Sequence, residues 1–550
     1  MFTIRRLYLY GVSAIALALM AVGAGSLIEL AFERLGRAIA GTGVIGPGLD
    51  RELLALSVAL LLVGLPLWLV HWWLAERSVR RDTPEADAER RSVIRALYLA
   101  GVAAVALGYL ATGGVAFVET LIRAPSSWPV DLAGPLAHTL VALAVLAFHI
   151  RTRILDTAAG SLAGAAAWLG RLYLYGAVVG GAFVGLWGVS RAIEVVGNEV
   201  LGTGAIGTAF RFELANAVAL TVVGALVWLA HAWYARRLPT CDDWRGEAER
   251  ASLVRAAHGV VGAGIATVIS IFAVASTLGW LFGQALGVGA AADTARAIQQ
   301  TVGPLAAMLP FLVGGVLFGA LTVREASRFR GPEAAVAARR SLRLTIAGIG
   351  LAIGSVGLVR ALGVTVEAAL GPAAIGGIAY QDEIARMLPY AVVGLPTWLV
   401  AWALVLRDGA GDRLGEARSM ARRLYLFLVV GVSVTSAGLA LAFLIYQGLR
   451  VVLDIGYVEG WELGQPFVIV VVGAVALLYH LWVLRGDLAL KAIAEPTVAP
   501  AAEGVAAVVE ELVLEGPAGS DVEAVNRVLR EHLPSGWTMR VVHHGAGAGH

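Results

Sequence analysis

Cysteine and lysine are almost absent from this chain of 550 residues. The one cysteine, Cys241, has no partner for an intrachain disulfide and cannot build a cysteine-based metal cluster. The one lysine, Lys491, follows the last long apolar segment, so the apolar part of the chain has no lysine for Schiff-base or nucleophilic chemistry. These two absences exclude disulfide-stabilised folds and lysine-dependent catalysis.

Catalytic signature motifs are also missing. The sequence contains no phosphate-binding Gly-x-x-x-x-Gly-Lys-Ser/Thr, no His-Glu-x-x-His, no Gly-x-Ser-x-Gly and no Cys-x-x-Cys. We therefore expect that the protein is not an enzyme and has no catalytic residues. We also expect that it holds no cofactor or metal and does not bind nucleic acid.

Charged residues are scarce, at 15% of the chain, whereas hydrophobic residues make up 58% and the mean hydropathy is +0.77. Soluble domains carry about 25% charged residues. The composition therefore predicts a protein whose main partner is the lipid bilayer.

Six pairs of apolar segments follow one another along the chain. Each segment has about 20 residues or more, which is enough for a helix to cross about 30 Å of hydrocarbon. The lead-in residues recur at intervals of 75 to 90 positions: Tyr8, Tyr98, Tyr173, His258, Arg343 and Tyr425. The predicted spans are 7–32, 53–75, 95–121, 132–150, 170–196, 212–235, 254–283, 299–322, 342–368, 384–406, 422–449 and 465–484. The pattern predicts an all-α polytopic membrane protein with about 12 transmembrane helices.

Arginine is concentrated in alternate connections between these spans. The arginine-rich connections lie within 77–91, 151–153, 236–250, 324–340 and 407–422. Because basic residues are retained on the cytoplasmic side, these connections and both termini are predicted to be cytoplasmic.

The hairpins themselves duplicate in pairs. RLYLYG at 6–11 recurs at 171–176, and the loop GTGVIG at 41–46 returns as GTGAIG at 202–207. Because the first segment repeats inside the chain, we interpret it as a retained span and not as a cleaved signal peptide. Three four-helix repeats are expected, at 1–160, 161–335 and 336–490. Such parallel copies favour an arrangement around a pseudo-threefold axis.

A second recurring motif closes two of the spans, GLPLWLVHW at 64–72 and GLPTWLVAW at 394–402. Together with the RLYLY openings, it resembles the bacterial four-helix integral membrane family named domain of unknown function 5671, in three tandem copies. The resemblance implies a membrane fold and brings no known activity or catalytic residues. We accordingly expect the bacterial cytoplasmic (inner) membrane as the location.

The C-terminal region differs in composition from the rest. An Ala/Pro-rich linker at 491–505 leads into a segment, 506–550, whose pattern predicts a small cytoplasmic strand-helix-strand tail. Ser520 and Glu523 form a capping box at the start of its helix. So short a unit buries little surface, so we expect it to contact a protein partner or a second copy of itself.

Three glutamates share one register. Glu29, Glu119 and Glu194 each lie 21 residues after the tyrosine that opens their segment, which is about 32 Å from the cytoplasmic end at 1.5 Å per residue. Arg123 and Arg191 lie one helical turn away from two of them, which favours ion pairs at the far interface. An acidic ring that binds cations or a headgroup amine is the alternative.

Four histidines share a register near the cytoplasmic ends of their spans. His71, His231 and His480 each follow a glycine by seven residues, and His149 has the matching place in the fourth span. Tryptophans 72, 73, 233, 402 and 482 lie at a similar depth, which favours an interfacial aromatic belt. A ligand or metal site is the alternative, since ionisable groups in membranes are costly and often functional.

The two registers are separated by nearly the whole bilayer, and we identify no titrating cluster between them. The leading hypothesis is a non-catalytic membrane scaffold or sensor that contacts a partner through the tail. The alternative is a channel or carrier for a small neutral or apolar solute, which needs no charge at the midplane.

Overall fold

The computed structural model describes residues 2–41, 47–80, 83–125, 127–159, 164–203, 207–288, 294–370, 377–454, 461–494 and 528. Residues Met1–Ala494 form one compact unit, and Glu495–His550 form a second. Apart from Val528, the predicted strand-helix-strand tail lies outside the described residues, as does most of the repeated GTG loop.

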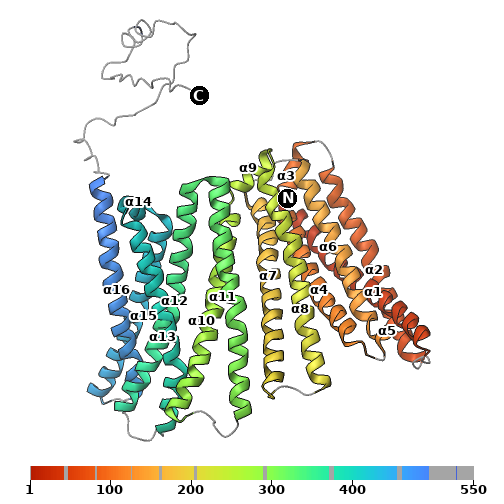
Figure 1. The fold of residues 1–550 in the computed structure, drawn as a ribbon. Coiled ribbons are helices and arrows are strands. Elements are labelled where there is room, and N and C mark those ends of the chain that lie inside the picture. Colours follow the sequence, from red (N-terminus) through yellow and green to blue (C-terminus); the bar gives the residue numbers. More distant parts are fainter. Residues whose placement is uncertain are drawn as a thin grey trace. The chain divides into compact units, whose positions relative to one another are not determined.

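Twelve of the described helices are long and apolar enough to cross a membrane, which confirms the predicted number (Figure 1). They are α1 (Phe2–Ala40), α2 (Pro47–Val79), α4 (Val93–Arg123), α6 (Ala133–Ala159), α7 (Gly164–Val200), α8 (Thr208–Arg237), α10 (Leu253–Leu286), α11 (Thr294–Arg330), α12 (Pro332–Leu370), α13 (Gly377–Gly409), α15 (Met420–Val452) and α16 (Trp461–Ala494). Most extend beyond the predicted spans, because hydropathy detects only the apolar centre of a helix whose polar ends continue past the hydrocarbon.

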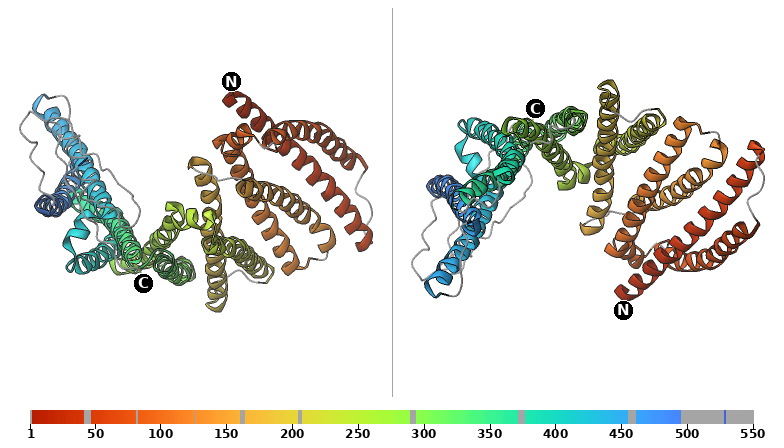
Figure 2. Two further views of the ribbon diagram at one scale, coloured as in Figure 1. Left: turned by 90° about the horizontal axis from the view of Figure 1, so that it is seen from above. Right: turned by 90° about the horizontal axis from the view of Figure 1, so that it is seen from below.

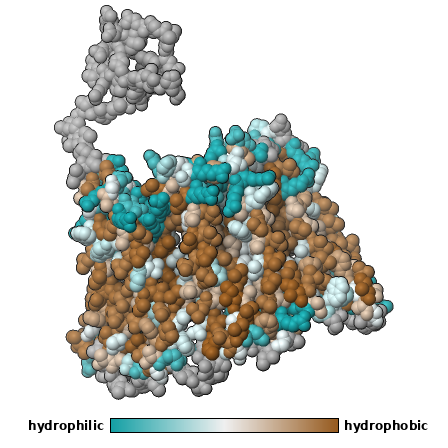
Figure 3. Space-filling model, viewed as in Figure 1, coloured by the Kyte–Doolittle hydropathy of each residue, from teal (hydrophilic) through white to brown (hydrophobic). Residues whose placement is uncertain are grey.

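Short helices join several of the long ones. They are α3 (Pro84–Arg90), α5 (Trp128–Asp131), η1 (Leu238–Thr240), α9 (Trp244–Arg250) and α14 (Arg413–Arg418). Helices α3, α9 and α14 lie at the same end of the bundle, which we call the arginine-rich face (Figure 1). Figure 3 shows hydrophilic surface gathered at this end and an apolar band over the helices beyond it. The other end is called the opposite face.

Each repeat packs its helices in the same way. The first long helix of each repeat (α1, α7 or α12) contacts the second, the fourth and, less extensively, the third of that repeat. Glycines allow the first and second helices to approach closely. A side chain at Gly224 would meet the backbone of Gly185 at 2.2 Å, and one at Gly394 would meet Gly354 at 2.5 Å.

The three repeats are arranged in a row within this unit, and the second repeat lies between the first and the third (Figure 2). The third helix of one repeat packs on the first two helices of the next: α4 contacts α7 and α8, and α10 contacts α12 and α13. The predicted pseudo-threefold axis is therefore wrong. The third helix of one repeat thus meets the first two helices of the next at both junctions, and α11 also contacts α12 at the second. Such a heterologous contact gives an open row when its rotation does not close a ring.

Candidate functional site

The predicted glutamate ion pairs are present near the opposite face. Arg123 Nη1 lies 3.1 Å from Glu119 Oε1, and Arg191 Nη1 lies 2.6 Å from Glu194 Oε2. Glu119 also accepts a hydrogen bond of 3.0 Å from Asn216 of the second repeat. Glu119 therefore helps to join the first two repeats.

The three glutamates share one sequence register but occupy two different positions in the structure. Glu29 and Glu194 lie on the first helix of their repeats, close to a glycine of the fourth helix. A methyl group added to Gly134 would lie 2.8 Å from Glu29 Oε1, and one added to Gly303 would lie 3.2 Å from Glu194 Oε1. The equivalent in the third repeat is Glu367, which accepts a hydrogen bond of 3.2 Å from the backbone N–H of Gln465. The sequence pattern missed Glu367 because it lies one helical turn later. In the described part of the chain, no ion pair or hydrogen bond joins Glu29, Glu119 and Glu194 to one another.

Each of the four predicted histidines forms the same pair of hydrogen bonds. The Nδ1 atom contacts the carbonyl oxygen four residues earlier, at 2.7 to 2.8 Å, and Nε2 contacts a tyrosine hydroxyl. The Nε2-to-hydroxyl distances are 3.3 Å for His71–Tyr8, 3.3 Å for His149–Tyr98, 3.1 Å for His231–Tyr173 and 3.2 Å for His480–Tyr425. Tyr8, Tyr98, Tyr173 and Tyr425 are the lead-in residues of the sequence repeat.

These contacts define the tautomer of each ring. A carbonyl only accepts, so Nδ1 carries the hydrogen and the tyrosine donates to Nε2. Both ring nitrogens are then engaged, and each histidine stays within its own repeat. His149 and His480 are 1% exposed, and their rings lie near the buried Trp72 and Trp402. The exposed tryptophans 73, 233 and 482 are the ones that fit the predicted interfacial belt.

A network of charged residues at the arginine-rich face was not anticipated as a site. It follows a motif, Glu-x-x-Ser-x-x-Arg, that occurs once in each repeat, at 89–95, 249–255 and 416–422. The glutamate is at or near the end of a short helix, the serine is the N-cap of the third long helix, and the arginine is in that helix's first turn. Ser252 and Ser419 accept hydrogen bonds from the backbone N–H three residues later, which stabilises the helix start.

In the first repeat the network is centred on Arg95, whose side chain is fully buried. Arg95 donates to both carboxylate oxygens of Asp156 on α6, at 2.7 and 3.0 Å, and to Glu76 on α2 at 3.0 Å. Tyr10 on α1 accepts from Arg95 and donates to Glu89 on α3, each at 3.1 Å. The charges thus join all four long helices of the repeat to its short helix.

The other repeats build most of this network from equivalent residues, although the position of Glu76 is occupied there by Arg236 and Leu406. In the second, Glu249 accepts from Arg171 at 2.9 Å and from Tyr175 at 2.5 Å, and Arg255 pairs with Glu325 at 2.7 Å. In the third, Arg340 pairs with Glu416 at 2.6 Å and Arg422 pairs with Asp487 at 2.7 Å. Leu344 replaces the tyrosine there. In each repeat the glutamate of the short helix is bonded to the first long helix, so the short helix is held against its bundle.

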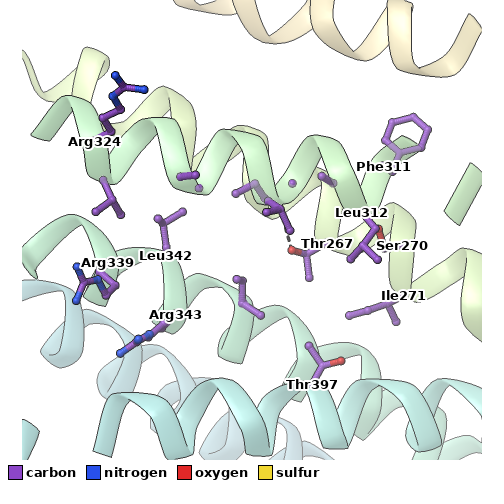
Figure 4. A pocket seen from close by; sticks show the side chains of 18 of the residues that line it. Thr267, Ser270, Ile271, Phe311, Leu312, Arg324, Arg339, Leu342, Arg343 and Thr397 are labelled. Atoms are coloured by element: carbon purple, nitrogen blue, oxygen red, sulfur yellow. Dashed lines mark hydrogen bonds between the residues drawn. The ribbon is translucent and has the colours of Figure 1, made fainter. Parts of the chain in front are cut away.

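Open cavities lie at the repeat-to-repeat junctions. One of about 1100 Å³ lies between α10 and α11 of the second repeat and α12 and α13 of the third. Figure 4 shows Arg324, Arg339 and Arg343 at one end of it and Phe311 and Ser270 toward the other. None of the four predicted histidines or three predicted glutamates lines it.

One family model accounts for the repeats. The domain of unknown function DUF5671 matches residues 6–148, 171–313 and 340–475, so that each match runs from the first long helix of a repeat into its fourth. No curated protein and no solved structure matches the chain. The matches cover more than half of the chain, which therefore belongs to the DUF5671 family and contains three tandem copies of its domain.

Proposed function

We propose that this multi-pass membrane protein is a non-catalytic scaffold that assembles with further copies of itself in the plane of the membrane. The observation that carries the proposal is the repeat-to-repeat contact, which is used at both internal junctions and leaves one unmatched surface at each end of the row. These end surfaces are the third helix of the last repeat, α15, and the first two helices of the first repeat, α1 and α2. A heterologous contact that does not close can continue from one molecule to the next.

The internal junction identifies which residues would meet between two copies. A side chain at Gly114 on α4 would lie 3.4 Å from Val223 on α8. The equivalent of Gly114 in the third repeat is Leu441, because each lies 19 residues after the arginine of its motif, Arg95 or Arg422. The equivalent of Val223 in the first repeat is Val63, because each directly precedes the matching glycine, Gly224 or Gly64. Leu441 and Val63 are 47% and 54% exposed, so both are accessible to a second copy.

Charge complementarity supports the same register. Arg123 lies over the ring of Phe212 at 3.8 Å, where the first two repeats meet. Their equivalents at the two ends are Arg450 on α15 and Glu52 on α2. Glu52 is exposed. Arg450 also pairs with Glu462 of its own repeat, at 3.8 Å, so Glu52 of another copy would be its second acidic neighbour. Like charges at this place would oppose the contact.

Disulfide cross-linking tests this assembly. In a Cys241→Ser background, Leu441→Cys and Val63→Cys variants are expressed together in one membrane and oxidised. We expect a covalent dimer only when both variants are present, because a disulfide needs Cα atoms about 4.4–6.8 Å apart. Leu439→Cys is the matched control, since it is 70% exposed and aligns with Thr112, an exposed α4 residue. Equal cross-linking of Leu439→Cys, or none with Leu441→Cys, would contradict the proposal.

The orientation and location are part of the proposal. We place the arginine-rich face and both termini in the cytoplasm, and the protein in a bacterial inner membrane, because arginine-rich connections are retained inside. Cys241 is exposed at the arginine-rich face. We expect a membrane-impermeant maleimide to label Cys241 only after the cells are permeabilised. Labelling in intact cells would show that the orientation is the opposite one.

The absence of catalysis also remains a proposal. It is supported by the charged clusters, in which the acids are engaged by arginines, and by the histidines, whose nitrogens are both hydrogen-bonded. A partner bound by residues 506–550 stays a prediction, because that tail, apart from Val528, lies outside the described residues.

The cavity between α10 and α13 favours a carrier of a small neutral or apolar solute as the second candidate function. A carrier must open its site to both faces in turn. Glycerol uptake into proteoliposomes above the rate of protein-free vesicles would favour the carrier, because a scaffold leaves uptake at that rate.

A further inference from the structure

The cavity between the second and third repeats combines a basic end with an apolar interior. Its basic end is formed by four arginines: Arg324 and Arg328 near the end of α11, and Arg339 and Arg343 near the start of α12. Arg343 forms an ion pair with Asp408. Among the described residues, no acidic side chain forms an ion pair with Arg324 or Arg339. Two exposed guanidinium groups are therefore available to an anion at the cavity entrance.

The interior of the cavity suits hydrocarbon. Small and aliphatic side chains of α10 and α11 line it, among them Ala266, Ile271 and Gly315. Polar groups are few: Thr267 donates to the carbonyl of Ala263, and the Ser270 hydroxyl is buried without a hydrogen-bond partner in the described structure. A fully polar ligand would lose its hydration there without replacement hydrogen bonds.

The depth of the cavity matches one leaflet of a bilayer. Its lining on α11 runs from Arg328 to Phe311, which is about 25 Å along a helix with a rise of 1.5 Å per residue. Half of a hydrocarbon core of about 30 Å, with the adjoining headgroup region, has a similar depth. A ligand that extends from the arginines to Phe311 would thus lie as a lipid lies in the leaflet.

We propose that this cavity binds an anionic phospholipid, with its phosphate at Arg324 and Arg339 and its acyl chains along α10 and α11. Arginine matches the geometry of phosphate oxygens, and basic pockets between transmembrane helices recognise anionic headgroups. A neutral lipid would leave the arginines uncompensated, and free phosphate would leave the apolar interior empty. The gap between α4 and α7 is smaller, about 340 Å³, and its lining contains no arginine, so the basic cavity is specific to the second junction.

Lipid binding to the full chain tests the proposal by native mass spectrometry in detergent. We expect the protein to bind phosphatidylglycerol more tightly than phosphatidylcholine. The double variant Arg324→Ala, Arg339→Ala should weaken phosphatidylglycerol binding by about 30-fold, since each basic residue contributes about fivefold near an anionic surface. It should weaken phosphatidylcholine binding less, because the choline group cancels the charge of that lipid's phosphate. Arg413→Ala is the control, because Arg413 is exposed on the same face and does not line the cavity.

A second variant tests the acyl part of the site. Gly319 lines the cavity, and a side chain there would meet only Leu342, at 3.8 Å, so Gly319→Leu should fold and fill the space. We expect it to weaken the binding of both lipids. Unchanged phosphatidylglycerol preference in the arginine variant would overturn the proposal. Unchanged lipid binding by Gly319→Leu would show that the lipid does not bind in this cavity. If inorganic phosphate competed as well as the lipid, the arginines would form a phosphate site instead.

Discussion

Replacing Arg95 with alanine should lower the free energy of unfolding by about 3–5 kcal/mol, the cost of breaking a buried ion pair by removing one partner. Arg95 is fully buried, and its loss leaves the carboxylate of Asp156, 8% exposed, without its guanidinium partner. Unfolding in mixed micelles with increasing SDS measures the change. We expect the largest effect at Arg95, and a smaller one for Arg255→Ala, because its partner Glu325 is 28% exposed and can be hydrated.

The matched control for Arg95 is Arg80→Ala. Arg80 approaches the same glutamate, Glu76, at 3.6 Å, but its side chain is 78% exposed. Its removal should therefore cost less than about 1 kcal/mol. The double variant Arg95→Leu, Asp156→Leu should be more stable than Arg95→Leu alone, since it removes the unpaired charge. Equal losses for Arg95→Ala and Arg80→Ala would show that the network does not clamp the first repeat.

The second large effect is expected from Gly224→Leu, which should destabilise the protein by about 3 kcal/mol or more through overpacking. The added Cβ would lie 2.2 Å from the backbone nitrogen of Gly185, so α7 and α8 would have to separate. Backbone atoms cannot move aside as a flexible side chain can. The same SDS titration measures the loss.

Gly448→Leu is the control for this substitution, because a side chain at Gly448 on α15 meets no atom within 4 Å. Leucine also has the higher helix propensity, so this variant should be neutral or slightly more stable. A stability loss as large as that of Gly224→Leu would indicate a general cost of glycine replacement and would remove the argument from close helix approach.

The membrane spans were predictable from composition alone. Lipid requires about 20 consecutive apolar residues in each crossing helix, whatever its neighbours are. The span predicted at 422–449, for example, corresponds to α15, Met420–Val452. The ion pairs of Glu119 and Glu194 were also predictable, because their arginines lie three or four residues away on the same helix.

The charged network could not be predicted from the sequence in the same way. Arg95 and Asp156 are 61 residues apart, and nothing in their spacing shows that α4 and α6 bring them together. The repeated Glu-x-x-Ser-x-x-Arg motif was a usable signal. Of its three arginines, only Arg422 lies in a connection that was interpreted as cytoplasmic charge, and Arg95 and Arg255 follow such connections directly. The common register of Glu29 and Glu119 was misleading for a related reason, since α1 and α4 have different neighbours within the repeat.

By itself, the sequence determined that the chain enters lipid, that it does so about twelve times, and that its helices come in three copies. These properties depend on contributions that add along the chain, such as the transfer of each apolar side chain out of water. Only the tertiary structure decided that the copies form a row, that Arg95 is buried while Arg80 is exposed, and that four arginines lie at one end of an apolar cavity. These outcomes depend on which helix faces pack together, and that lateral packing is set by shape and distance between residues far apart in the chain.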